Sequence, residues 1–362
     1  MHELQEKRDR LLGFMEEHHL DAVVLNRVAN FAWYTCGVEP VVMLSSERAE
    51  AAIVVERDRQ FVLCNSVEYP RLREEEALDR RGFEFRVSPW YETGDLLSGA
   101  VRGRRWAADW PLEGCEDLSR EIARLRYQLT APEIERYRSL GQRTGMALER
   151  SARGVQPGMS EAQIAGTIAA EALSEGVTPT LLLVGADDRV FHYRHPIPTA
   201  RKVERHCMLV LCARHQGLVA SATRLVHFGE LDNELRARER ACAYVDAVFI
   251  ANTRIGASLA DIFSAGERAY AESGFGGEWQ KHFQGGAAGY ESRDYEATPN
   301  CREIVLADQA FAWNPSITGV KSEDTVIVQA DGVEFLTATG NWPSIGVEVA
   351  GRTWDRPAIL VG

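Results

Sequence analysis

The sequence lacks several features that would place it in a specialised class of protein. Its seven cysteines are scattered and none forms a CxxC pair, so neither a disulfide framework nor a thiolate zinc site is expected. Its apolar runs fall far short of the roughly 20 residues that a membrane-spanning helix needs. The charged N-terminus shows no signal-peptide pattern. We therefore expect a cytoplasmic protein that does not associate with membranes.

Positively charged residues are also fewer than negatively charged ones. The 362 residues carry 41 Lys and Arg against 53 Asp and Glu, which gives a formal net charge of −12. An acidic chain lacks the electrostatic footprint of a general nucleic-acid binder, so no nucleic-acid partner is expected. The remaining composition, 45% hydrophobic and 26% charged, is that of an ordinary globular protein. A chain of this length typically divides into two domains.

Widespread catalytic and cofactor-binding motifs are missing as well. We find no GxGxxG fingerprint, Walker loop, GxSxG, HExxH or EF-hand loop. No cofactor is therefore predicted, and any site has to be found from less regular patterns.

The first third of the chain has the pattern of a small α/β domain. Helical spacing of apolar residues covers 1–20, and short strand patterns follow at 21–25, 51–55, 61–64, 83–87 and 105–109. Thr130, Pro132 and Glu133 then form the start signal of a long helix that should end near Arg153. We place the domain boundary here, with domains at 1–127 and 128–362.

The second domain contains an internal echo. Pro157-Gly158-Met159-Ser160 resembles Ile255-Gly256-Ala257-Ser258, and each segment follows a long helix, 130–153 or 232–252. Strand patterns come after each, at 179–184, 207–213, 217–227, 303–314, 324–329 and 333–338, with a hairpin turn at Asp331-Gly332. We interpret this as a duplicated helix–helix–strand unit, which would place a site between the halves. The alternative is that any two capped helices look alike.

Three segments of this domain could carry chemistry. Residues 191–199 hold His192 and His195 in a loop whose prolines restrict the backbone, which suits an imidazole positioned for proton transfer. Residues 282–294 hold closely spaced glycines that allow close approach to a ligand or to another strand. Glu323 precedes a buried strand and needs a cationic partner, a metal or a substrate cation. The alternatives are a solvated loop for the histidines and a structural ion pair for Glu323, with Lys321 or an arginine.

Together these segments resemble, in order, the pita-bread family of creatinase, prolidase, aminopeptidase P and methionine aminopeptidase. The resemblance covers nearly the whole chain, including residues 20–24 and 30–37 of the first domain. It implies an α/β creatinase-type N-terminal domain followed by an α+β pita-bread domain with a pseudo-twofold duplication. It also implies a homodimer.

The family's metallopeptidases bind two divalent metals through two aspartates, a histidine and two glutamates, the arrangement of two-metal hydrolysis. In this sequence four of the five corresponding positions are Val210, Ser221, Gly286 and Asn314, and only Glu323 is retained. One carboxylate cannot hold two metals, because each needs several ligands. The resemblance therefore predicts a family member without a dinuclear metal site.

Creatinase is the family's precedent for hydrolysis without a metal. It uses a histidine in the loop before the first metal-site strand, and the setting of His195 matches that loop. Thr223 stands where a second substrate-binding glutamate would be, which argues against creatine as substrate. We predict His195 and Glu323 as catalytic residues, with Arg293 or Asn314 near a developing oxyanion. The predicted substrate-binding residues are His192, Arg224, Tyr290, Glu291, Arg293, Trp313, Asn314, Lys321 and Trp342.

For several of these residues a structural role is the alternative. Trp313 and Trp342 could be core, Lys321 with Glu323 could be a strut, and His192 could cap its loop. Three functions follow from the same residues. The first is metal-independent hydrolysis of a C–N bond in a small or dipeptide-like molecule. The second is a binding protein or pseudoenzyme that lost its chemistry, and the third is a metallopeptidase of the Xaa-Pro type whose ligands lie elsewhere.

Overall fold

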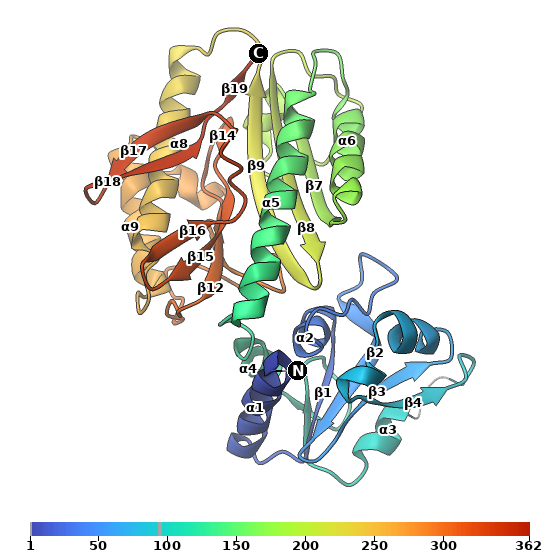
Figure 1. Ribbon diagram of the computed structural model, residues 1–362. Coiled ribbons are helices and arrows are strands. Elements are labelled where there is room, and N and C mark those ends of the chain that lie inside the picture. The colour runs from blue at the N-terminus through green and yellow to red at the C-terminus, as the bar shows by residue number, and fades with distance from the viewer. Residues whose placement is uncertain (1, 93–95) are drawn as a thin grey trace. The chain divides into compact units, whose positions relative to one another are not determined.

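The computed structural model describes residues 2–92 and 96–362 and divides them into two compact units (Figure 1). One unit comprises the described residues up to Arg126 together with Gln216–Leu218, and the other comprises Tyr127–His215 and Val219–Gly362. All seven cysteines lie in the described residues and are free thiols. None of the described helices is long and apolar enough to cross a membrane.

The first unit is an α/β structure built on a six-stranded sheet of order β4-β3-β2-β1-β5-β6. Strands β1, β2 and β3 are antiparallel neighbours, whereas β3–β4, β1–β5 and β5–β6 are parallel. The apolar runs expected to form strands do so because both faces are buried, and Val23, Val24 and Leu25 are fully inaccessible. The elements are α1 (His2–Glu17), β1 (Ala22–Arg27), α2 (Val28–Tyr34), β2 (Arg48–Glu56), β3 (Gln60–Asn65), β4 (Glu84–Ser88), α3 (Leu96–Val101), β5 (Trp106–Ala108), β6 (Glu116–Asp117) and α4 (Ser119–Arg124).

The second unit contains two sheets with helices packed on them. The first half consists of α5 (Ala131–Arg153), α6 (Glu161–Ser174), β7 (Thr178–Ala186), α7 (Asp188–His192), β8 (His206–His215) and β9 (Leu218–His227). The second half begins with α8 (Asn233–Asn252), α9 (Leu259–Glu272), β10 (Gly285–Ala288), β11 (Tyr295–Glu296), β12 (Gln309–Trp313), β13 (Ser316–Ile317), β14 (Val320–Lys321), β15 (Asp324–Gln329) and β16 (Gly332–Phe335). The chain ends with the hairpin β17 (Ser344–Val349) and β18 (Arg352–Pro357) and the short β19 (Leu360–Val361).

Sheet order shows that the two halves are copies of one plan. The strands run β19-β9-β8-β7 in one sheet and β11-β10-β12-β15-β16 in the other. Each half has two helices followed by three strands that are neighbours in one sheet, β7-β8-β9 in the first half and β10-β12-β15 in the second, and Figure 1 shows a helix pair with each sheet. The duplication and the fold class expected from the sequence are both present.

The echo in the sequence corresponds to two turns with the same hydrogen bonds. In the first turn Gly158 N donates to Val203 O and Val203 N donates to Met159 O, at 2.8 and 2.9 Å. In the second, Gly256 N donates to Val305 O and Val305 N to Ala257 O at the same two distances. A single supersecondary design, used twice, explains why the two sequence segments look alike.

The start signals of the helices work as the sequence predicts. The Glu133 side chain accepts the backbone N–H of Thr130 at 2.7 Å at the start of α5. At α6, Ser160 and Gln163 exchange side-chain-to-backbone hydrogen bonds of 2.9 and 3.2 Å, the reciprocal pattern of a capping box. These caps fix where α5 and α6 begin and therefore how the chain enters each strand that follows.

Candidate functional site

Two neighbouring strands place Glu323, the retained carboxylate, beside Asn314, which stands at the position of a second one. Strands β12 and β15 are antiparallel, and Trp313 lies opposite Asp324. Asn314 comes directly after Trp313, and Glu323 comes directly before Asp324. Because the strands are antiparallel, these two residues are neighbours at the same end of the strand pair. Thr223 of β9 joins this row, because its backbone N–H donates to Glu323 O at 3.1 Å. Asn314 and Glu323 are both buried.

Both oxygens of Glu323 are held by cations. Arg293 Nη2 lies 2.9 Å from Oε1, and Lys321 Nζ lies 2.7 Å from Oε2, which also accepts the Thr223 hydroxyl at 2.7 Å. Burial works to raise the pKa of this carboxyl, but the charges of Lys321 and Arg293 outweigh it and lower the pKa to about 2. Glu323 is therefore ionised at neutral pH, with no oxygen left over for another strong ligand.

A pair of histidines lies beside this cluster. Nε2 of His195 lies 3.2 Å from Nε2 of His282, and Nδ1 of His282 lies 3.1 Å from the Ser316 hydroxyl. His195 is exposed and His282 is buried, so the pair leads from solvent into the unit. Burial, with the charge of Lys321, lowers the pKa of His195 and lowers that of His282 to about 2. Both imidazoles are neutral at pH 7.

A two-stranded ribbon connects the histidines to the carboxylate. Strands β13 and β14 are antiparallel, with Ser316 directly opposite Lys321. Ser316 binds His282 and Lys321 binds Glu323, so one pair of facing residues supports both groups. Tyr270 fixes the ribbon further, because its hydroxyl accepts the backbone N–H of Ser316 at 3.0 Å.

The positions at which the family binds metals do not suit a metal here. Val210 is apolar, the Ser221 hydroxyl donates to the Cys212 thiol at 3.2 Å, and Asn314 is neutral. Gly286 cannot carry a side chain, because a Cβ at this position would lie 2.2 Å from Tyr295 O. Glu323 already has two cationic partners. Among the described residues no group of three or more His, Cys, Asp or Glu side chains is arranged to hold a metal. The residues present therefore do not fit a dinuclear centre.

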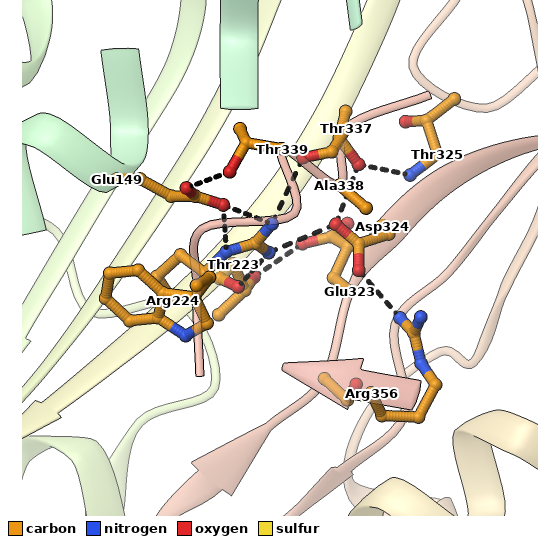
Figure 2. A network of polar contacts seen from close by, with 12 residues as sticks. Glu149, Thr223, Arg224, Glu323, Asp324, Thr325, Thr337, Ala338, Thr339 and Arg356 are labelled. Atoms are coloured by element: carbon orange, nitrogen blue, oxygen red, sulfur yellow. Dashed lines mark hydrogen bonds and ion pairs between the residues drawn. The ribbon is translucent and has the colours of Figure 1, made fainter. Parts of the chain in front are cut away.

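Arg224, predicted to bind substrate, lies in a buried ion-pair network (Figure 2). Its guanidinium donates to Glu149 Oε1 at 3.2 Å, to Asp324 Oδ1 at 3.1 Å and to the carbonyl of Thr337 at 3.1 Å. Arg356 binds the other oxygen of Asp324 at 2.8 Å, as Figure 2 also shows. This geometry assigns Arg224 a supporting role: it anchors Asp324, the residue after Glu323, from behind.

Both predicted tryptophans lie in the interior. Trp313 stacks on Phe249 with ring centroids 4.6 Å apart, and its Nε1 donates to Thr253 Oγ1 at 3.0 Å. Trp342 Nε1 donates to Ala358 O at 2.8 Å, and its ring lies beneath the Arg224 guanidinium at 5.9 Å. The structure thus supports the core alternative for both residues.

The other predicted residues lie in the two loops. His192 is exposed, and its Nδ1 lies 2.7 Å from the carbonyl of Asp188 in its own helix, α7. The buried Tyr290 donates its hydroxyl to Glu133 Oε1 at 2.6 Å, which makes it a support for α5. Glu291 follows in the same loop and accepts the Gly289 N–H through its carbonyl. Of the predicted set, the structure brings His195, Arg293, Lys321, Glu323 and Asn314 close together.

His282 and Ser316 also lie in this cluster, although neither is among the residues predicted from the sequence. His282 opens the glycine-rich segment, and Ser316 follows the Asn314-Pro315 pair, so both lie within segments already singled out. Their contact joins residues 34 apart, and the contact of His282 with His195 joins residues 87 apart. The only signal in the sequence for these contacts is that histidines recur beside the singled-out segments.

Comparison with solved structures shows the fold class of the whole chain. The chain superposes on the prolidase from Pyrococcus horikoshii with a TM-score of 0.79, at 16% identity, over 92% of this chain and 98% of that one. It superposes equally well on the Xaa-Pro dipeptidase from Bacillus anthracis, with a TM-score of 0.79, 16% identity and 99% of both chains. An uncharacterized peptidase of Staphylococcus saprophyticus is 22% identical over 91% of this chain and 99% of its own.

Family models identify the chain more directly. The model of metallopeptidase family M24 matches residues 135–330, and that of the Creatinase/Prolidase N-terminal domain matches residues 7–139. The chain therefore belongs to metallopeptidase family M24, a family of peptidase-like hydrolases with the pita-bread fold. Most of the positions that bind metals in that family are replaced here.

Proposed function

We propose that this protein hydrolyses a C–N bond in a small molecule without a metal, with His195 as the acid–base residue. The observation that carries the proposal is the contact between His195 and His282 at 3.2 Å, with its second anchor on Ser316. This contact holds one nitrogen of an exposed imidazole and leaves the other directed away from it. An imidazole oriented in this way can exchange protons with a water molecule and a leaving amine.

The hydrogen bonds of the pair can be arranged in two ways. In one, His195 donates to His282, which donates to Ser316, and Nδ1 of His195 is a proton acceptor. In the other, all donors and acceptors are reversed, and Nδ1 of His195 carries a proton. The first arrangement suits the removal of a proton from water, and the second suits its delivery to the departing nitrogen.

The charge state of the histidines agrees with this role. Burial, with Lys321, lowers the pKa of His195, so the imidazole is neutral and able to accept a proton at pH 7. Glu323 does not serve as a second base, because its oxygens are bound by Lys321, Arg293 and Thr223. We assign Glu323 a positioning role, holding Lys321 near the histidines.

Metal independence is supported by charge as well as by the missing ligands. A divalent cation approaching Glu323 would have to displace Lys321 or Arg293, each within 3 Å of a carboxylate oxygen. Repulsion between these cations and a metal is strong in a buried setting, where the effective dielectric constant is low. The proposed reaction therefore uses only side chains of this chain.

The test is a substrate screen with and without metal. Purified protein treated with EDTA is incubated with N-acyl amino acids, ureido and guanidino acids and Xaa-Pro dipeptides, and products are measured by mass spectrometry. We expect turnover that added manganese does not increase. His195→Ala should lower kcat/KM at least about 100-fold, the usual contribution of a general base.

His192→Ala is the matched control, because His192 is an exposed histidine three residues before His195 that is hydrogen-bonded to Asp188 of its own helix. It should keep full activity. Turnover that depends on manganese, or that survives His195→Ala, would contradict the proposal. Circular dichroism of each variant confirms that the fold is intact.

A binding protein without catalysis is the second candidate. The observation in its favour is that all three partners of Glu323 are intramolecular, so the former catalytic carboxylate is fully engaged. In that case a compound from the same screen would raise the melting temperature and no product would form.

The homodimer and the cytoplasmic location expected from the sequence remain predictions. Light scattering coupled to size-exclusion chromatography checks the first, and fractionation of cells checks the second.

A further inference from the structure

The charges around Glu323 do not balance. Lys321 and Arg293 both face this one carboxylate, and all three side chains are at least nine-tenths buried. Among the described residues no other carboxylate lies within ion-pair distance of either cation. His195 and His282 add no charge, since the pKa of each is lowered. The cluster thus carries one positive charge in excess, in a chain whose net charge is −12.

The ion pairs next to the histidines do not cancel this excess, whereas the buried network that begins at Asp324 holds three carboxylates against two arginines. Arg194 is paired with Glu278 at 2.5 Å, and Lys281 lies 2.7 Å from the same side chain. That group is itself positive by one. The local excess of buried positive charge beside the histidines favours an anion that binds from outside or forms during the reaction.

Lys321 is the cation that faces the histidines. It lies on β14 opposite Ser316, the residue that anchors His282. Its charge helps to lower the pKa of both His195 and His282. An ammonium group has three donors, and in the described residues one ion pair, with Glu323, is found for Nζ.

We propose that Lys321 is a catalytic residue that stabilises the negative charge developing on the substrate oxygen, so that the site binds small tetrahedral oxyanions. This rests on the proposed function. Attack by water on the substrate carbon forms a C–O bond, and the electron pair of the C=O bond moves to oxygen beside Nζ. The water proton goes to His195. The oxyanion electrons then re-form the C=O bond, the C–N bond breaks with its pair on nitrogen, and His195 returns the proton to that nitrogen.

This assignment differs from an oxyanion group at Arg293 or Asn314. Arg293 directs Nη1 to the carbonyl of Ser292 at 2.6 Å and Nη2 to Glu323, and its buried Nε has no hydrogen-bond partner among the described residues. Lys321, and not Arg293, lies opposite Ser316, the residue that anchors His282. Asn314 has a buried amide oxygen without a hydrogen-bond partner in the described part of the chain, which can accept a hydrogen bond. That oxygen suits the N–H of the substrate's C–N bond.

The experiment uses methylphosphonate, a small tetrahedral oxyanion, as the probe. Its binding to the full chain is measured by calorimetry at constant ionic strength. We expect saturable binding that weakens at least about 10-fold in Lys321→Met and is largely restored in Lys321→Arg. Lys281→Met removes one exposed lysine outside the cluster and should bind like the wild type.

Lys321→Met should fold, because Arg293 and Glu323 then form a balanced pair, and Lys321→Arg gives a second folded comparison. Wild-type protein that does not bind methylphosphonate would overturn the proposal. So would equal binding by Lys321→Met, or equal weakening by Lys281→Met. The proposed function is tested separately. If methylphosphonate binds through Lys321 but no C–N substrate is turned over, only the proposal of hydrolysis is rejected. Turnover that needs His195 but not Lys321 rejects only the role of Lys321.

Discussion

Glu323 is the residue on which the charges of the site converge. Its replacement by Gln removes the one anion that contacts Lys321 and Arg293 among the residues that the structure describes, and leaves two buried cations without a counter-ion. Removal of one partner from a buried ion pair costs about 3–5 kcal/mol. We expect Glu323→Gln to lower the free energy of unfolding by this amount in urea. Glu334→Gln, which breaks a half-exposed pair with Arg138, should cost less than about 1 kcal/mol. Equal effects would contradict the charge assignment.

The same residue predicts a dependence on pH. Folding lowers the pKa of Glu323 from 4.5 to about 2, so its stabilising contribution is present above pH 4.5 and is lost as the pH falls toward 2. The difference in stability between the wild type and Glu323→Gln should shrink over this range. His282 lowers the stability already at higher pH. Its pKa is 6.5 in the unfolded chain and about 2 in the folded protein, so below pH 6.5 the unfolded imidazole takes up a proton and the folded one does not. Urea unfolding at a series of pH values measures both effects.

At the scale of elements, the pairing of β10 with β11 closes the position at which family members place a histidine. Gly286 lies opposite Glu296, and a Cβ would contact Tyr295 O at 2.2 Å. Gly286→Ala should therefore force the strands apart and cost about 1–3 kcal/mol or more. Gly277→Ala is the control, since open space surrounds that position and its φ of −91° suits any residue. Thermal unfolding of both variants checks this, and a harmless Gly286→Ala would show that the position is open.

Elements with a strong local pattern were predictable from the sequence. The helix predicted from 130 to 153 forms as Ala131–Arg153, and the strand predicted at 324–329 forms over the same residues. Both are predictable because capping signals and apolar runs act locally. Strand β10 was not predicted. Its sequence, Gly-Gly-Ala-Ala, has no β-branched residue, and only its place between β11 and β12 makes it a strand.

At the scale of the whole molecule, the duplication accounts for most of the larger unit. Gly158 and Gly256 occupy equivalent turns with φ of +91° and +83°, and neither would meet an atom within 4 Å if a Cβ were added. Alanine at either position therefore costs only backbone strain, about 1–2 kcal/mol. We expect the two substitutions to lower the free energy of unfolding in urea by equal amounts. Gly166→Ala, in an open position of helix α6, should be neutral or stabilising. Unequal losses at Gly158 and Gly256 would show that the turns differ.

The sequence by itself determined the two-domain plan, the duplication and the replacement of the metal ligands, because these depend on residue types and local patterns. The tertiary structure decided what took the place of the metals. Lys321, Arg293 and Glu323 meet because β14, the loop after β10 and the start of β15 converge, and His195 meets His282 across 87 residues of chain. Such contacts depend on long-range register, which no local pattern encodes, and they decide which of the predicted residues form the site and which support it.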